Sequence, residues 1–322
     1  MVECELCPRH CRLQNGQRGN CRARMNIDGK LMSLVYGQPC AVHADPIEKK
    51  PLFHVLPGSG SFSIATAGCN GHCKYCQNWQ ISQSNPEETT NVDLPPDKVV
   101  AAALNSRCHS IAYTYSEPII FYEYMFDTAD IAHRQGLLNV MVSAGYIEQK
   151  PLVDLCPQID AANVDLKAMN DETYVNLTTM HMKPVLDTLV TMKKNNVWVE
   201  ITNLIVPTWN DRDKDFRQLA RWVKDHLGAD TPVHFSRFWP MHQLLNLPAT
   251  PPETLRRAWD IAKAEGLHFA YVGNVPGHPG NNTYCPKDHK PVIRRRGYRI
   301  LENNIIDGKC KFCGTTIPGI WA

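Results

Sequence analysis

The stretch SIATAGCNGHCKYCQNW, residues 63–79, begins as a short apolar strand and runs directly into three cysteines. Cys69, Cys73 and Cys76 lie within a span of eight residues. In parallel α/β folds, the side chains that carry chemistry gather just past the carboxyl ends of the strands. The stretch therefore predicts a strand whose end carries a metal or cluster site.

Apolar, β-rich runs alternate with amphipathic stretches through the middle of the chain. The predicted strands are 61–66, 110–115, 138–143, 160–166, 197–206, 232–238 and 268–273. Apolar residues at helical spacing predict helices between them, beginning near Asp97, Pro118, Pro184 and Pro252. This alternation is typical of βαβ units and a parallel sheet, which is either doubly wound or closed toward a barrel.

The composition narrows the class of protein. The chain has 34 Lys and Arg against 32 Asp and Glu, a formal charge of +2 that provides no strong attraction to nucleic acid or anionic membranes. No apolar run approaches the roughly 18 residues of a spanning helix, and the N-terminus does not resemble a signal peptide. We expect a cytoplasmic protein, in which the 13 cysteines serve metals or clusters and not disulfides.

Three thiols in a tight loop indicate a particular kind of site. Two cysteines would suit a redox pair or half of a zinc site, and four would complete a tetrahedral zinc site. Three thiolates fit three corners of a [4Fe–4S] cluster and leave the fourth iron without a protein ligand. The spacing favours such a cluster over zinc, and an open iron could bind a substrate or cofactor.

These residues resemble the radical S-adenosylmethionine (SAM) enzymes, whose signature is similar to Cys69-x3-Cys73-x2-Cys76 with aromatic Tyr75 before the last cysteine. The segments DLKAMND, residues 165–171, and IVPTWND, residues 205–211, are similar to pyruvate formate-lyase activating enzymes. The segments CELCPRHC (4–11), DPIEKKPL (45–52), CQNWQISQ (76–83), YTYSEP (113–118) and HFSRF (234–238) resemble the AmmeMemoRadiSam radical SAM proteins. The resemblance extends over nearly the whole chain.

The resemblance implies a partial, open TIM-type barrel of about six to seven βα units, with small cysteine-rich modules at both ends. Its implied divisions are an N-terminal cysteine-rich module with lead-in strands (1–60), the radical SAM barrel (61–275) and a C-terminal zinc-ribbon-like module (276–322). The implied cofactors are a [4Fe–4S] cluster and SAM, which would bind the open iron through its amino and carboxylate groups. One-electron reduction would then give a 5′-deoxyadenosyl radical that abstracts hydrogen.

The resemblance also assigns residues to SAM. Glu117 stands where the family places a carboxylate on the SAM ammonium, although Tyr115-Ser116 replaces two glycines of the family motif. Asp165 and Lys167 match a pair that holds the methionine part of SAM. Strand alternation places Glu200 and Thr202 on one face, where both are expected to line the cavity. Together the predicted cofactor-binding residues are Tyr75, Ser116, Glu117, Asp165, Lys167, Glu200 and Thr202. Trp239 stands where relatives carry a histidine, and His242 is a candidate substitute.

Two further cysteine sets lie at the ends of the chain. Cys4, Cys7, Cys11 and Cys21 provide enough thiolates for a closed zinc site, which we favour, or for an auxiliary iron–sulfur cluster. Cys285, Cys310 and Cys313 resemble a zinc ribbon that lacks one cysteine, with Asp288 at the missing position and His289 next to it. We predict zinc there with His289 as the fourth ligand.

The leading functional prediction is a radical SAM enzyme that modifies a small molecule or a protein side chain. One alternative is an activating enzyme that installs a glycyl radical on a partner enzyme, and another is a zinc-ribbon module that binds nucleic acid, which the near-neutral charge disfavours. The expected partners are an electron donor such as flavodoxin or ferredoxin and, from the resemblance, Memo-type and AMMECR-type proteins.

Overall fold

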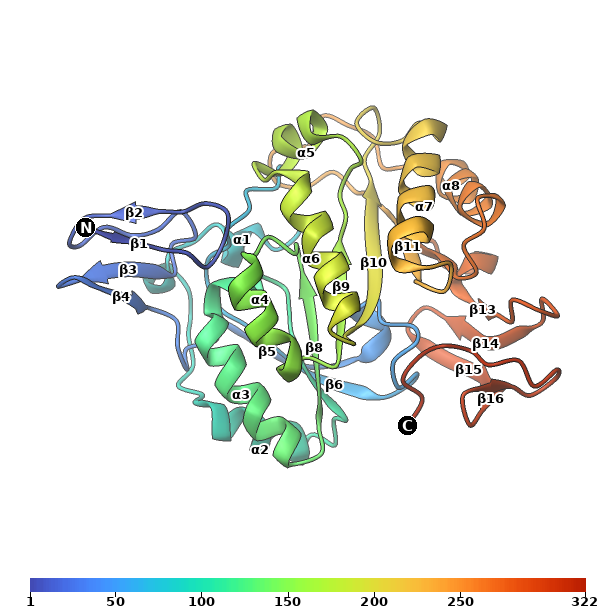
Figure 1. The fold of residues 1–322 in the computed structure, drawn as a ribbon, viewed down its shortest axis with the longest axis horizontal. Helices are drawn as coiled ribbons and strands as arrows, with labels where there is room; N and C mark the ends of the chain where they lie inside the picture. Colours follow the sequence, from blue (N-terminus) through green and yellow to red (C-terminus); the bar gives the residue numbers. More distant parts are fainter.

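The computed structural model describes all 322 residues and is built around one eight-stranded sheet (Figure 1). The sheet order is β12-β11-β10-β9-β8-β7-β6-β5, with β6 to β12 parallel and β5 antiparallel to β6. The strands are β5 (Ala41–Pro46), β6 (Gly60–Ala65), β7 (Ser110–Tyr113), β8 (Leu138–Ser143), β9 (Ala161–Asp165), β10 (Trp198–Ile205), β11 (Val233–Arg237) and β12 (Ala270–Gly273). Because β5 and β12 are the two edges, the barrel is open. The predicted fold class is confirmed.

Helices connect the parallel strands and cover one side of the sheet. They are α1 (Trp79–Ser82), α2 (Pro96–Asn105), α3 (Tyr122–Arg134), α4 (Gln149–Leu155), α5 (Asp171–Thr178), α6 (Met182–Lys194), α7 (Asp213–Leu227) and α8 (Pro252–Ala264), with short 3₁₀ turns η1 (Ile47–Lys49), η2 (Pro86–Glu88), η3 (Pro118–Phe121), η4 (Cys156–Gln158) and η5 (Pro279–Asn281). Proline at the first turn of α2 and α8 suits a helix start, since its missing N–H would have no partner there.

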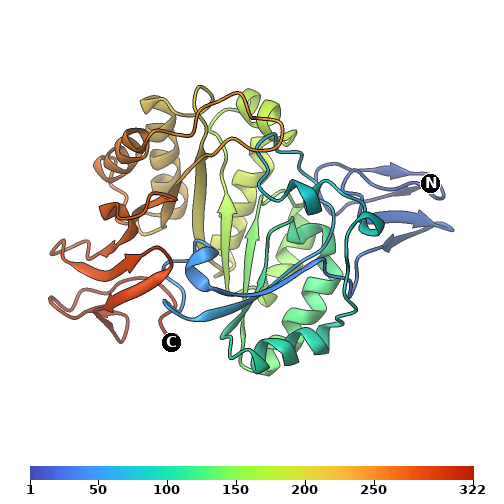
Figure 2. The same ribbon diagram turned by 180° about the vertical axis from the view of Figure 1, so that it is seen from behind.

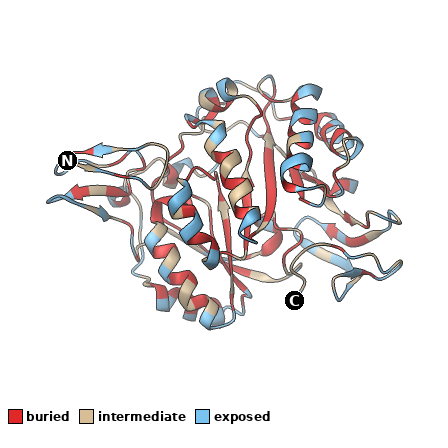
Figure 3. Cartoon of the chain, viewed as in Figure 1, coloured by how far each residue is buried: buried red, intermediate tan, exposed pale blue.

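The main core lies between these helices and the sheet. It contains 54 buried residues, and Figure 3 shows buried residues on the longer helices where these face the strands. Burial on both faces explains why the parallel strands appear in the sequence as nearly continuous apolar runs. A smaller cluster fills the inside of the barrel near the amino ends of β9 and β10, where Ile47, Leu52 and Val55 pack on Val140 and Ala161.

The chain ends form small β modules at opposite ends of the molecule (Figures 1 and 2). The N-terminal module has two hairpins, β1 (Val2–Glu3) with β2 (Arg12–Leu13) and β3 (Arg24–Ile27) with β4 (Lys30–Ser33). The C-terminal module contains β13 (Thr283–Tyr284), β14 (Pro291–Arg296), β15 (Arg299–Asn303), β16 (Ile305–Ile306) and β17 (Lys309–Cys310). Phe269 and Tyr271 of the barrel pack against its buried Cys285 and Val292.

Candidate functional site

A cavity of about 690 Å³ opens at the carboxyl ends of the parallel strands. Most residues predicted from the sequence line it: Cys69, Cys73, Cys76, Ser116, Glu117, Asp165, Lys167 and Thr202. They come from the ends of different strands and the loops that follow, so the parallel sheet itself brings them together. The volume is in the range of cavities that take cofactors and small molecules.

The three cysteines follow β6 on one loop that ends at the short helix α1. The sulfur of Cys69 accepts a hydrogen bond from the backbone N–H of Gly71 at 3.3 Å, and the sulfur of Cys76 lies 3.2 Å from the hydroxyl of Ser82. These contacts hold Cys69 and Cys76 in position on the loop. The loop presents all three thiols to one side of the cavity.

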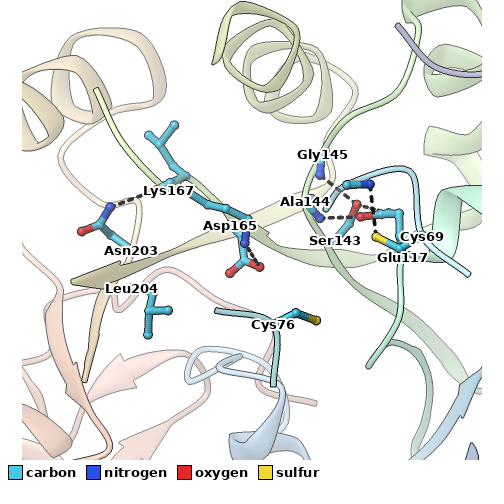
Figure 4. A network of polar contacts seen from close by, with 12 residues as sticks. Cys69, Cys76, Glu117, Ser143, Ala144, Gly145, Asp165, Lys167, Asn203 and Leu204 are labelled. Atoms are coloured by element: carbon cyan, nitrogen blue, oxygen red, sulfur yellow. Dashed lines mark hydrogen bonds and ion pairs between the residues drawn. The ribbon is translucent and has the colours of Figure 1, made fainter. Parts of the chain in front are cut away.

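Glu117 has a carboxylate that the fold holds rigidly (Figure 4). Its oxygens accept hydrogen bonds from the hydroxyl of Ser143 at 2.6 Å, the N–H of Ala144 at 2.7 Å and the N–H of Ile119 at 3.2 Å. Burial nevertheless raises the pKa of this carboxyl group, since the three hydrogen bonds offset only part of the desolvation. A cation brought beside Glu117 would stabilise its ionised form.

Asp165 and Lys167 form an ion pair, with Nζ of Lys167 at 2.8 Å from a carboxylate oxygen of Asp165. Burial disfavours the ammonium, but the charge of Asp165 is close enough that the pKa of Lys167 is raised above its usual value. Asn203 donates to the carbonyl oxygen of Leu166 at 2.7 Å (Figure 4). Asn210 donates to the carbonyl oxygen of Lys167, also at 2.7 Å, and the two contacts fix the backbone of this segment. The pair is a preorganised partner for a group that carries both an amine and a carboxylate.

Tyr115 occupies the left-handed region of backbone space, with φ of 63°. Glycine adopts this conformation without strain, which explains why the family motif has glycine there. In this chain the strain is offset by contacts of the tyrosine side chain. Its hydroxyl donates to Asp45, and Nζ of Lys50 lies 4.3 Å from the centre of its ring. The departure from the family motif is therefore accommodated by a local network with β5.

Unpartnered polar atoms test whether the cavity suits SAM. The hydroxyl oxygens of Ser116 and Thr202 are buried, line the cavity and have no hydrogen-bond partner within the protein. Buried polar groups are normally satisfied, so these two are available to a polar ligand. With three thiols on one side and the Glu117 and Asp165–Lys167 charges nearby, the residues present fit a [4Fe–4S] cluster and SAM.

Two predicted site residues do not line this cavity. Tyr75 is buried in a separate apolar cluster with Phe238 and Leu244. Glu200 is fully buried beneath the cavity, and its carboxylate accepts from the N–H groups of Phe53 at 3.0 Å and His54 at 2.8 Å. The expectation that Glu200 lines the cavity is wrong because the segment after β5 supplies backbone donors that occupy it.

Other residues in the lining were missed as site residues. His234 lines the cavity, and its Nε2 lies 2.6 Å from Glu200, so Glu200 orients His234 from below. Lys49 and Lys50 also line it, and burial lowers the pKa of Lys50 to about 8 despite its pairing with Asp45. The HFSRF and DPIEKKPL segments marked these regions, but which side chain would face the cavity depends on tertiary packing.

The residues at the family's histidine position lie outside this lining. Trp239 is 47% exposed, and the guanidinium of Arg237 lies 4.3 Å from the centre of its ring. His242 stacks on Trp79 with ring centres 5.3 Å apart. His242 therefore does not line the cavity as a substitute for the missing histidine.

The C-terminal cysteines form a compact group with an aspartate. Ligand atoms of Cys285, Asp288, Cys310 and Cys313 all lie within 4.8 Å of one another, including a sulfur–sulfur distance of 3.5 Å between Cys285 and Cys313. His289 is exposed and outside the group, so the prediction of His289 as fourth ligand is corrected to Asp288. The N–H of His289 instead closes the turn by donating to the carbonyl of Cys285 at 3.0 Å.

The N-terminal cysteines also share one location. Cys4, Cys7, Cys11 and Cys21 line a single small cavity between the hairpins and the barrel. Their sulfurs do not form a compact group of the C-terminal kind. Each of the three cysteine sets identified in the sequence is thus brought to one place in the structure, and the C-terminal set is the compact one.

The model of the Radical SAM superfamily matches residues 63–223, which is half of the chain and contains the three-cysteine loop, Glu117, Asp165 and Lys167. This chain belongs to the radical SAM superfamily. Since the family uses [4Fe–4S] and SAM, the family assignment and the cavity agree on the cofactors.

Among the relatives of this radical SAM protein is MJ0808, an uncharacterized protein of Methanocaldococcus jannaschii. It is 45% identical over 98% of this chain and 95% of that protein. A protein of the same organism, MJ1632, named as a candidate glycyl-radical enzyme activating enzyme, is 24% identical over 67% of this chain and 80% of that protein. The pyruvate formate-lyase-activating enzyme of Clostridium pasteurianum is 22% identical over 49% and 67%, respectively. The radical SAM protein is therefore homologous to glycyl-radical activating enzymes.

Solved structures show the same fold. A radical SAM methyltransferase from Sphaerobacter thermophilus aligns over 70% of each chain with a TM-score of 0.51 and 17% identity. SuiB of Streptococcus suis, bound to its precursor peptide SuiA, aligns over 71% of this chain and 51% of its own with a TM-score of 0.52 and 12% identity. These likenesses support the open barrel.

None of the helices in this chain has the length and apolarity needed to span a membrane.

Proposed function

We propose that this radical SAM protein reductively cleaves SAM and uses the resulting radical to modify a small molecule or a protein side chain. The observation that carries the proposal is the convergence of three thiols, the Glu117 carboxylate and the Asp165–Lys167 pair on one cavity. When bound, the [4Fe–4S] cluster and SAM supply one-electron cleavage of the sulfonium and a 5′-deoxyadenosyl radical that abstracts hydrogen.

In this proposal, residues of the chain bind the cluster and orient SAM. Cys69, Cys73 and Cys76 hold three irons, Glu117 accepts from the SAM ammonium, and Lys167 offers a positive charge to the SAM carboxylate. Ser116 and Thr202 supply hydroxyls that lack other partners. The fixed hydrogen bonds around Glu117 and the backbone of Lys167 reduce the cost of ordering these groups when SAM binds.

The remainder of the cavity suits a substrate that carries polar or anionic groups. Lys49 and Lys50 line it from the segment after β5, His234 lines it from β11, and Tyr298 reaches it from the C-terminal module. Cationic side chains would attract an acidic substrate, and His234, held by Glu200, could accept or donate a proton. Walls contributed by these three parts of the chain favour a substrate bound within the cavity.

Activation of a glycyl-radical enzyme is the second candidate function, because MJ1632 and the C. pasteurianum enzyme are homologous. We rank it lower because modules at both ends exceed what activation alone requires.

The AmmeMemoRadiSam resemblance favours Memo-type and AMMECR-type partners, and a flavodoxin or ferredoxin of the reducing cytoplasm as electron donor.

We also propose zinc as the ion for the compact C-terminal group, whose three thiols and one carboxylate suit tetrahedral zinc.

Deuterium transfer separates the two functions. Reconstituted protein is incubated with SAM, a reductant and extract from cells grown in heavy water, divided into a small-molecule fraction and a protein fraction. The leading proposal predicts deuterium in 5′-deoxyadenosine with the small-molecule fraction, or with the protein fraction without a stable glycyl radical. Deuterium from the protein fraction, together with a stable glycyl radical in its electron paramagnetic resonance (EPR) spectrum, would overturn the ranking.

A further inference from the structure

The three cysteine sets differ in how far their sulfurs are spread. The C-terminal ligand atoms gather within 4.8 Å, but neither the N-terminal four nor Cys69, Cys73 and Cys76 form such a group. A single zinc with Zn–S bonds near 2.3 Å holds its thiolates about 3.8 Å apart. A cluster of several irons holds its thiolates further apart because each binds a different iron. Like the barrel thiols, the N-terminal thiols are not gathered as closely as a single zinc ion would hold them.

The N-terminal thiols surround a space. All four line one cavity together with apolar Leu6, Leu13, Ile119 and Ile120. Gly19 packs against two of them, since a β-carbon placed on it would sit 3.7 Å from the sulfur of Cys21 and 3.8 Å from that of Cys11. Four thiols around an apolar cavity match the surroundings of a buried metal cluster.

Arg24 provides independent evidence for an anionic occupant. This residue is 4% exposed and lines the cavity, yet its Nε has no hydrogen-bond partner. Both terminal nitrogens donate to the Glu123 carboxylate, Nη1 at 2.9 Å and Nη2 at 2.5 Å, which leaves only Nε without an acceptor. A buried, unpaired N–H of a guanidinium is costly unless something accepts from it. Cluster sulfide or thiolate sulfur would supply that acceptor.

We propose that Cys4, Cys7, Cys11 and Cys21 hold an auxiliary [4Fe–4S] cluster in place of the zinc expected from the sequence. Four thiolates would occupy all four irons, so this cluster has no open site for SAM. Binding of the cluster does not depend on the proposed function.

The position of this site suggests its role, which does rest on the proposed function. Asn70 lines the N-terminal cavity and directly follows Cys69 of the barrel loop. A β-carbon at Gly68 would collide with the carbonyl oxygen of Cys21, so the two loops are in direct backbone contact. A reduced ferredoxin or flavodoxin would give one electron to the N-terminal cluster, becoming oxidised by one electron, with no bond formed or broken. We assign this cluster as the entry point for electrons to the barrel site.

Iron analysis of variants tests the site itself. Protein is reconstituted anaerobically with iron and sulfide, and iron, sulfide and zinc are measured per chain. Wild type should hold about eight irons, from two clusters of four. Combined Cys69→Ala, Cys73→Ala and Cys76→Ala should leave about four irons and an EPR signal after reduction. Adding Cys7→Ala and Cys11→Ala to the triple variant should remove the remaining iron and the EPR signal. Cys40→Ala, at a half-buried cysteine outside the three sets, is the matched control and should change neither.

The contrary outcomes are distinct. About four irons in wild type with two zinc ions, or a folded triple variant that binds zinc or no metal, would overturn the proposal. If the triple variant keeps iron but wild type never cleaves SAM, the proposed function fails and the N-terminal cluster stands. If wild type cleaves SAM with only four irons, the proposed function stands and the proposal of an N-terminal cluster is wrong.

Arg24 offers a test that leaves all cysteines intact. The substitutions are made in the triple variant, whose remaining cluster is the N-terminal one. Arg24→Gln removes a buried positive charge beside this cluster, so its reduction potential should become more negative. Arg24→Lys keeps the charge, so the potential should stay close to that of the triple variant. Iron content should stay unchanged in both. A potential identical in all three proteins would show that Arg24 does not face a cluster.

Discussion

Glu117 shows how burial and backbone geometry prepare one side chain for a cation. Three hydrogen bonds fix its oxygens while burial raises the pKa of the carboxyl group. Glu117→Gln keeps the shape but removes the charge, so SAM affinity should fall about 10-fold to 100-fold, the value of a charge-assisted hydrogen bond. Iron content should not change. Equilibrium dialysis with SAM measures this, with Glu172→Gln on the exposed face of α5 as control. Equal affinity in both variants would refute the role of Glu117.

Tyr115 carries backbone strain that its side-chain contacts offset. Tyr115→Phe keeps the backbone and ring but loses the hydrogen bond to Asp45, which retains Lys49 and Lys50 as partners. The free energy of unfolding should fall by about 1 kcal/mol. Urea denaturation measures the change, and Tyr298→Phe, at a half-exposed tyrosine, is the comparison. A drop of equal size in both would show that the Asp45 contact is not stabilising.

At the scale of elements, the two turns that carry Cys285–Asp288 and Cys310–Cys313 test the zinc proposal. Asp288 is in the compact group and His289 is not, so Asp288→Ala should lower zinc content and the midpoint temperature of unfolding, whereas His289→Ala should change zinc little. Metal analysis and thermal unfolding with and without a chelator measure both effects, since structural zinc contributes directly to folding. The opposite order would restore His289 as the ligand.

The sequence was sufficient for the strands but not for every site residue. Seven parallel strands were predicted because a buried strand is recognisable from its own residues, and polar residues at their ends marked the cavity. The buried position of Glu200 could not be predicted from the sequence because the backbone N–H groups that bind its carboxylate, those of Phe53 and His54, lie about 150 residues earlier in the chain. Asp288 and His289 are adjacent, and only the folded turn decides which one faces the thiols. Spacing alone also cannot distinguish a compact thiol group from a wide one.

At the scale of the whole molecule, the cavity depends on every part of the chain. The barrel supplies the thiols and charges, the segment after β5 supplies Lys49 and Lys50, and the C-terminal module supplies Gly297 and Tyr298. The N-terminal module contacts the cysteine loop from the other side through Asn70. The two end modules therefore complete the surroundings of the barrel site and are not detached appendages (Figures 1 and 2).

The central claim is that the barrel cysteines support reductive cleavage of SAM. The decisive measurement is the amount of 5′-deoxyadenosine and methionine formed by anaerobically reconstituted protein with SAM and dithionite. Wild type should form both in equal amounts, and Cys76→Ala should form neither, while Cys40→Ala matches wild type. Wild-type protein with a full complement of iron that forms no 5′-deoxyadenosine, with or without partner proteins, would contradict the account.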